Sequence, residues 1–375
     1  MAVTSKGTAA GLVDWRTVER LTALIPAGPS ASRSARASSV AVLRRSALEA
    51  PAWVARITGL NRAAQQVAET TRVSVVDRAG LVRVSTRALR GLMEQVPAPQ
   101  ASEAVRLVGA AEMAGAMSLL ATRLLGQVVP AAGTGADGDG GRGGEASPHL
   151  LLVAPNVLAM RRQLDLDMLD LPAWVCLHEM THAVQLAAAP WLGPYLSDSM
   201  RMVIGAVVEA VYGGPGGGAD GTGEQGLRRR PGRAARIAAR AGRGRVLEGL
   251  TNFKERSEVA SLAAALTFLE GHAEVVLDDV HPNRMPSVHR LRAVLSRSRA
   301  ADAGIGPGPG LGSLLLHRLM GLEAKEAQYA DGTAFVRSVV ARIGHEGLNV
   351  VWTDPALLPT PAEIARPDVW VRRVG

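Results

Sequence analysis

Most of the chain carries apolar residues every three to four positions, which is the spacing of one face of an α-helix. Asp14 is a favoured N-cap residue, and it precedes a predicted helix over residues 15–25. The same pattern continues to residue 128. It predicts one or two helices over 34–58 broken near Pro51, a helix over 61–71, a turn at Ala79-Gly80 followed by a helix to residue 97, and an alanine-rich helix over 101–128 capped by Ser102 or the residue before it.

The chain after residue 148 is also mostly helical in its pattern, with one exception. Residues 149–153 (HLLLV) form a short continuous apolar run and are the best candidate for a β-strand. Pro172 lies in the first turn of a helix predicted over 172–189, where proline is favoured. Further helices are predicted over 156–164, 201–212, 256–280 and 313–345, before a proline-punctuated end over 352–375. We therefore expect a mainly α protein with few short strands.

Three glycine-rich stretches interrupt this pattern and have almost no large apolar side chains. They suggest insertions at 131–147, 213–245 and 301–312 within one large domain over 13–375, preceded by a flexible tail over 1–12. A division into two domains stays open, because 375 residues are enough for either arrangement.

The net charge of +8 is concentrated in one segment. Residues 228–245 contain eight arginines and no acidic residue, so the rest of the chain is close to neutral. A nucleic-acid partner is therefore not expected, although deletion of this segment would test it. The N-terminus has no apolar signal-peptide core and no run of eighteen apolar residues occurs, so we expect a cytoplasmic protein without a membrane span. The single cysteine, Cys176, excludes an intramolecular disulfide and is expected to be a small buried hydrophobic residue.

The predicted helix over 172–189 contains an HExxH array, His178-Glu179-Met180-Thr181-His182. Two histidines four residues apart lie one above the other on a helix, so both imidazoles can bind one metal ion. Glu179 can take a proton from a water on that metal, which is the role of a general base. A pair of packed histidines with an incidental glutamate is the alternative interpretation.

A catalytic zinc site requires a third protein ligand. The HExxHxxGxxH pattern is excluded, because Gln185 and Ala188 occupy the glycine and histidine positions. The stretch from Glu270 to Ala273, EGHA, resembles the E-G-x-A stretch that supplies the third ligand in many gluzincin-type peptidases. We therefore predict Glu270 as that ligand. Glu274 lies one turn later and is predicted to accept the N–H of a ligating imidazole, unless it and Asp278 form only a solvated acidic stripe.

Several segments resemble the actinobacterial zincin-like metallopeptidase family, whose members are labelled zinc-dependent metalloprotease or deazaflavin-coenzyme-biosynthesis-associated protein. They are VVDRAGLVR (75–83), LLLVAPNVLAMRRQL (150–164), WVCLHEMTHAVQ (174–185), LEGHAEVVLD (269–278), RLMGLEAKEAQYADGTAFV (318–336) and WTDPALLPTPAEIARPDVW (352–370). The resemblance implies a helix-rich zincin-like domain with a metal held by His178, His182 and Glu270. It does not supply a substrate.

These features together suggest a zinc-dependent hydrolase, specifically a metallopeptidase acting on a peptide or protein. Zn²⁺ held by the three ligands would activate a water and polarise the scissile carbonyl, and Glu179 would move the proton to the leaving amine. His272, Tyr195 and Tyr329 are equal candidates for stabilising the oxyanion. The alternative is a non-catalytic binding or assembly protein that retains the metal site. The sequence does not indicate an oligomeric state.

Overall fold

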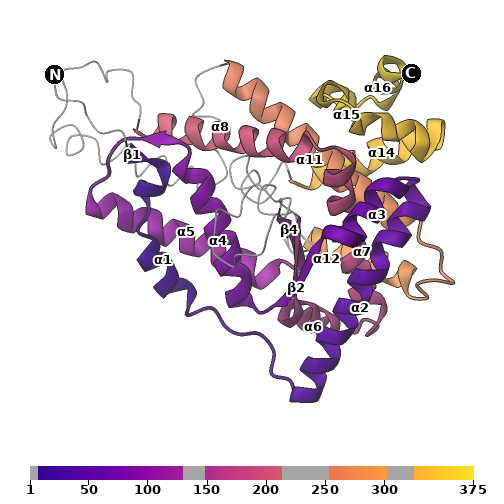
Figure 1. Cartoon of the computed structure of the whole chain (residues 1–375), viewed down its shortest axis with the longest axis horizontal. Coiled ribbons are helices and arrows are strands. Elements are labelled where there is room, and N and C mark those ends of the chain that lie inside the picture. The colour runs from indigo at the N-terminus through magenta and orange to yellow at the C-terminus, as the bar shows by residue number, and fades with distance from the viewer. Residues whose placement is uncertain (1–6, 130–147, 213–252, 302–324) are drawn as a thin grey trace.

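The protein is mainly helical, as predicted. A computed structural model describes residues 7–129, 148–212, 253–301 and 325–375 (Figure 1). In chain order its elements are β1 (Gly7–Thr8), η1 (Ala9–Leu12), α1 (Trp15–Thr22), α2 (Arg33–Thr58), α3 (Asn61–Thr70), β2 (Arg72–Val76), α4 (Arg78–Glu94), β3 (Pro97–Ala98), α5 (Glu103–Arg123), β4 (Gly126–Val129), β5 (His149–Val153), α6 (Ala154–Gln163), α7 (Asp170–Ala188), α8 (Leu192–Tyr212), α11 (Phe253–Asp278), α12 (Val288–Ala301), α14 (Lys325–Leu348), η5 (Asn349–Trp352), η6 (Pro355–Leu357), α15 (Pro361–Ile364) and α16 (Pro367–Val374).

A small three-stranded sheet lies between two hydrophobic clusters. Its strand order is β2-β5-β4, with β2 parallel and β4 antiparallel to β5. Side chains alternate between the two faces of a strand. Accordingly, Leu150 and Leu152 of β5 pack into a cluster with α2, α3 and α7, whereas Leu151 and Val153 pack into a cluster with α1, α4 and α5. The predicted strand over 149–153 is therefore confirmed.

Helix α11 crosses α14 at very short distance, next to the predicted third ligand. A Cβ atom at Gly271 would lie 2.3 Å from the backbone carbon of Gly332, and one at Gly332 would lie 2.2 Å from the backbone oxygen of Thr267. Only glycine allows two helix backbones to approach this closely. A third cluster, formed by α11, α14 and the C-terminal elements up to α16, surrounds this crossing. Figure 1 shows α14, α15 and α16 together at the C-terminal end of the molecule, beside α11.

Several predicted elements differ from the structure. Helix α2 is continuous through Pro51, because its packing along α7 outweighs the backbone hydrogen bond that proline removes. Ala79-Gly80 is not a turn: the Asp77 side chain caps α4 by accepting the Gly80 N–H at 2.7 Å, so both residues lie in its first turn. The helix expected over 101–128 ends at Arg123, and β4 follows because it pairs with β5.

The predicted flexible tail over 1–12 is wrong for its second half. Residues 7–12 form β1 and η1, in which Ala9 is fully buried and Leu12 nearly so. The predicted insertions at 131–147 and 213–245 lie outside the described residues, as do residues 302–312 of the third insertion and the arginine-rich segment 228–245. The single-domain arrangement therefore stays a prediction.

Two described helices are long and apolar enough to cross a membrane by length and composition alone. They are Glu103–Arg123 in α5 and Ser257–Asp278 in α11. The apolar window of the second is 72% buried inside the protein, as is usual for a core helix, and one or two such helices are weak evidence for a membrane span.

Candidate metal centre

Helix α7 carries the HExxH array through the interior of the protein. It is apolar on most of its circumference, which is the pattern of a helix buried on all sides. It packs against α2, α3, α11 and β4. Cys176, on this helix, is buried with its thiol 3.5 Å from the Leu43 carbonyl oxygen, so its prediction as a buried hydrophobic residue is confirmed. The array is therefore held on a rigid core element.

The structure brings His178, His182 and Glu270 together. The two histidine Nε2 atoms lie 3.3 Å apart. The Glu270 Oε2 atom lies 3.4 Å from His178 Nε2 and 3.7 Å from His182 Nε2. The histidines come from α7 and the carboxylate from α11, 88 residues after His182. Among the described residues these three form a group whose ligand atoms all lie within 4.8 Å of one another.

These separations fit a tetrahedral zinc site. With bonds of about 2.0–2.1 Å, two ligands of a tetrahedral zinc ion lie about 3.3–3.4 Å apart. Two of the three distances, 3.3 and 3.4 Å, agree with that value, and the third is 3.7 Å. Two imidazole nitrogens and one carboxylate oxygen also form a known donor set of catalytic zinc, which leaves one position open. The residues present therefore suit a zinc ion.

The carboxylate of Glu179 is almost completely buried between α7 and strand β4. Its Oε1 atom has no hydrogen-bond partner among the described residues. Gly126 of β4 makes room for it, since any side chain there would occupy the same space. Burial raises the pKa of Glu179 above its ordinary value, and the neighbouring Glu270 charge adds to this, against the lowering effect of both histidines. A raised pKa of this kind is a feature of carboxyl groups that exchange protons in active sites.

The charged forms of His182 and Glu270 stabilise each other. Burial alone would lower the pKa of His182, but the Glu270 and Glu179 carboxylates raise it to about 9. Burial likewise opposes the charged form of Glu270, yet the two histidines hold its pKa well below the ordinary value. A metal ion must therefore displace a proton from His182, so metal binding would release protons.

Glu274 lies on the opposite side of the His178 ring from Glu270. Its Oε1 atom is 3.8 Å from His178 Nδ1, which is beyond direct hydrogen-bonding distance, and the buried His178 Nδ1 has no hydrogen-bond partner among the described residues. Asp278 lies one helical turn after Glu274 but does not face the metal cluster. It forms ion pairs with Arg292 and Arg337, so the acidic stripe is divided between two environments.

Gln185 is a neighbour of the cluster that the sequence prediction missed. Its Oε1 atom lies 2.9 Å from His182 Nδ1, and its Nε2 atom donates to the Leu269 carbonyl at 2.9 Å. The signal was present in the sequence, because a residue three positions after His182 lies on the same helix face. From the sequence alone, however, Gln185 only excludes the HExxHxxGxxH pattern.

The three candidate oxyanion donors occupy different environments. His272 is buried in an aromatic group with Phe268 and Trp352, at ring-centroid distances of 6.4 and 5.3 Å, which favours a packed histidine over a substrate contact. Burial lowers its pKa to about 3. Tyr195 on α8 packs edge-on against Trp191. The side chain of Tyr329 lies outside the described residues.

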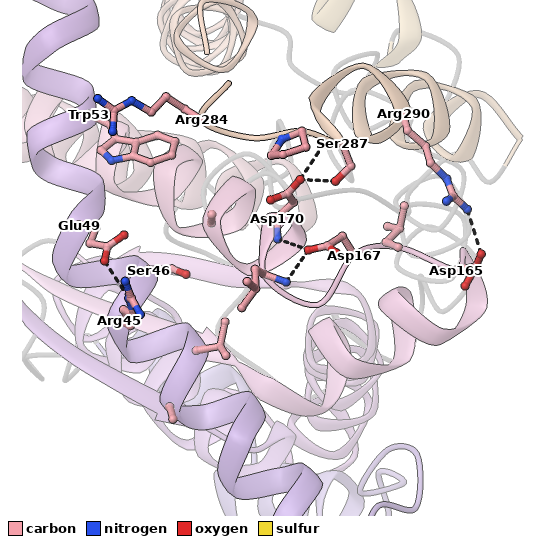
Figure 2. A pocket seen from close by; sticks show the side chains of 16 residues that line it. Arg45, Ser46, Glu49, Trp53, Asp165, Asp167, Asp170, Arg284, Ser287 and Arg290 are labelled. Carbon is pink, nitrogen blue, oxygen red and sulfur yellow. Dashed lines mark hydrogen bonds and ion pairs between the residues drawn. The ribbon is translucent and has the colours of Figure 1, made fainter. Parts of the chain in front are cut away.

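A separate cavity of about 1150 Å³ lies beside the N-terminal end of α7 (Figure 2). No predicted site residue lines it. Its acidic groups already have structural partners: Asp167 accepts the N–H groups of Leu169 and Asp170 at the start of α7, and Asp170 accepts the N–H of Ser287 at 2.7 Å. Figure 2 also shows Asp165 paired with Arg290 at its edge. The cavity is therefore distinct from the metal centre.

Comparisons with known proteins agree with this geometry. A family model described as zincin-like metallopeptidase matches residues 13–371. A solved structure from Chloroflexus aurantiacus, described as "a putative hydrolase with a novel fold", is similar with a TM-score of 0.56 and 20% identity, over 96% of this chain and 98% of that chain. At this identity the likeness shows a shared fold alone. No curated protein matches the chain.

Proposed function

The chain belongs to the zincin-like metallopeptidase family, and from this premise we propose that it is a zinc-dependent hydrolase that cleaves peptide bonds. The observation that carries the proposal is the convergence of His178, His182 and Glu270 from two helices, with the Glu179 carboxylate buried beside them. A structural zinc site does not require an adjacent general base, whereas a hydrolytic site does.

In this proposal the three ligands are His178, His182 and Glu270. A bound zinc ion supplies Lewis acidity, which polarises a carbonyl group and lowers the pKa of a water molecule to about 7. Glu270 contributes the negative charge that partly balances the cation. Glu274 would accept the Nδ1–H of His178 and fix the orientation of that ring once the present separation of 3.8 Å shortens on metal binding.

Glu179 is the general base in this proposal. Its burial favours the protonated form, so a proton accepted from the attacking water is held and then delivered to the leaving amine. The absence of a side chain at Gly126 leaves the space that the Glu179 side chain occupies beside the ligands. The substrate class is a peptide or protein, and the compartment is the cytoplasm. The actinobacterial origin and the link to deazaflavin-coenzyme biosynthesis belong to the same proposal.

The test combines zinc content with hydrolysis of casein and a panel of short peptides. We expect about one zinc per purified chain, loss of that zinc in His178→Ala, and its retention in Glu179→Gln. Glu179→Gln should lower the rate of hydrolysis by about 10²–10⁴-fold, the usual contribution of a general base. Glu112→Gln on the exposed face of α5 is the matched control and should change neither property.

Two results would contradict the proposal. A protein without zinc after purification under metal-replete conditions would remove the metal site. Stoichiometric zinc with no hydrolysis of any substrate would favour the non-catalytic binding or assembly protein instead.

A further inference from the structure

Gln185 contacts both helices that supply the predicted metal ligands. It lies on α7, three residues after His182, and is 1% exposed. Across the helix interface its side-chain nitrogen meets the Leu269 carbonyl and His272 Nδ1 on α11, at 2.9 and 3.0 Å. Both N–H groups of this buried amide and its oxygen, which faces His182, have partners, so its orientation is tightly restricted.

The Leu269 carbonyl oxygen determines which groups donate and which accept in the hydrogen bonds of the Gln185 amide. The Leu269 carbonyl oxygen can only accept, so the amide nitrogen of Gln185 must face it. The amide oxygen then faces His182 Nδ1 at 2.9 Å, and an oxygen there can only accept. His182 Nδ1 must therefore carry a proton. The second N–H of the amide donates to His272 Nδ1, which accepts as an unprotonated ring nitrogen.

This arrangement leaves the Nε2 atom of His182 for the metal. Once a metal ion has displaced the second proton of the charged ring, one nitrogen of the neutral imidazole carries the proton and the other carries the lone pair. With the proton kept on Nδ1, the lone pair lies on Nε2, which is the atom 3.3 Å from His178 Nε2 and 3.7 Å from Glu270. Leu269 directly precedes Glu270, so the same amide also ties the third ligand's backbone to α7.

We propose that Gln185 is a positioning residue of the metal centre, whose amide oxygen fixes the tautomer and ring orientation of His182 while its N–H groups hold α11 against α7. The role in metal binding rests on the proposed zinc site. The hydrogen bond to His182 is a property of the protein itself and has its own measurement below.

The test compares the zinc dissociation constants of Gln185→Met, Gln185→Glu and the unchanged protein by competition with a chelator. Gln185→Met keeps the length of the side chain and removes all three hydrogen bonds, so zinc should bind about 10–100-fold more weakly. Gln185→Glu keeps an acceptor for His182 and loses only the donors, so it should recover part of that affinity. Gln127→Met is the matched control: Gln127 is a buried glutamine on the neighbouring strand β4 and should leave zinc affinity unchanged.

A purely structural role for Gln185 predicts a different result. In that case Gln185→Met would lower the urea midpoint of unfolding, while the folded variant would bind zinc within twofold of the unchanged protein. This outcome would overturn the proposal, as would a Gln185→Glu variant that binds zinc no better than Gln185→Met.

Imidazole ¹⁵N NMR of the zinc-free protein separates this inference from the proposed function. We expect an exchange-protected Nδ1 proton on His182, assigned with His182→Ala, that disappears in Gln185→Met. If the protein binds no zinc but shows this proton, the proposed function fails and the positioning of His182 by Gln185 stands. If the proton is absent from the unchanged protein, the positioning role is wrong whatever the zinc content.

Discussion

Gly126 of β4 lies directly against the side chain of Glu179: a Cβ atom at residue 126 would stand 2.7 Å from Glu179 Cγ and 3.2 Å from its Oε1. The first distance is shorter than real Cβ contacts, so the glutamate would have to move. We predict that Gly126→Ala retains zinc, because none of the three ligands is touched, and loses most hydrolysis, because the general base is displaced. Zinc content and peptidase rate measure the two effects.

Gly91→Ala is the control for this variant. A Cβ at Gly91 of α4 would meet no atom within 4 Å, and alanine is a better helix former than glycine. It should leave both zinc content and rate unchanged. Full activity of Gly126→Ala would show that Glu179 does not need its present position.

The Gly271–Gly332 crossing predicts a coupled loss of stability and zinc. In Gly271→Ala the new methyl group would meet the backbone of α14 rather than a flexible side chain, so α11 and α14 must separate. Overpacking typically costs about 1–3 kcal/mol, and this contact is closer than most. Because Glu270 is the adjacent residue, zinc should also bind more weakly. Urea unfolding and chelator competition measure the two effects.

Gly115→Ala on the exposed side of α5 has no neighbouring atom within 4 Å and serves as its control. It should stabilise the protein by up to about 1 kcal/mol. An unchanged unfolding midpoint in Gly271→Ala would contradict the close crossing.

Arg373 and Glu363 form the best-defined ion pair near the C-terminus. Arg373 Nε lies 2.7 Å from Glu363 Oε1, and the 7%-exposed carboxylate also accepts from Thr360 in a capping box. Arg373→Met would remove the charged hydrogen bonds to this carboxylate, which we expect to cost about 1.5–3 kcal/mol because the pair is only partly buried. Arg372→Met, which breaks only the exposed pair with Asp368, should cost at most about 1 kcal/mol. Equal unfolding free energies for the two variants would contradict this prediction.

The Arg373–Glu363 ion pair should also make the free energy of unfolding depend on pH. Burial alone would raise the pKa of Glu363, but Arg373 and the Thr360 hydrogen bonds hold it below the ordinary value of 4.5. A carboxyl group with a lowered folded-state pKa stabilises the protein above its unfolded-state pKa and loses that effect as the pH falls. The stability difference between the unchanged protein and Arg373→Met should therefore be largest near neutral pH and shrink as the pH falls through the acidic range, where Glu363 becomes protonated in both proteins. Urea titrations between neutral and acidic pH measure this.

Zinc should stabilise the folded protein, since the third ligand is brought to the histidines only by folding. A ligand at 100 times its dissociation constant contributes about 2.7 kcal/mol to the free energy of unfolding. We expect the zinc-induced rise in melting temperature to vanish in Glu270→Ala and to persist in Glu209→Ala on the exposed surface of α8. A rise of equal size in Glu270→Ala would place the zinc elsewhere.

Local signals in the sequence predicted those parts of the fold that depend on a few neighbouring residues. Asp14 and Ser102 are N-caps in the structure as predicted, because their side chains accept backbone N–H groups only two or three residues away. Strands β2 and β4 were missed since each has at most five residues and exists through pairing with β5. The helix break expected at Pro51 is absent for a similar reason, because packing against the distant helix α7 keeps α2 continuous.

In the candidate site, too, the features set by local spacing could be predicted, whereas those set by tertiary packing could not. The spacing of His178 and His182 follows from helix geometry, so their common face could be predicted. Glu270 was proposed by resemblance, and the structure brings it to the two histidines. The contacts of Gln185 with Leu269 and His272 could not be predicted, because they require the packing of α7 on α11.

The direct contact of backbones at Gly271 and Gly332 has a consequence for how the centre captures a cation. With no side chain between the two backbones at Gly271 and Gly332, the position of the Glu270 backbone does not depend on the rotamer of a residue at this crossing. Ordering a free glutamate side chain costs up to about 2 kcal/mol of conformational entropy. Here that ordering accompanies folding, so the centre is preorganised, and the zinc-free and zinc-loaded proteins are expected to have nearly superimposable ligand positions.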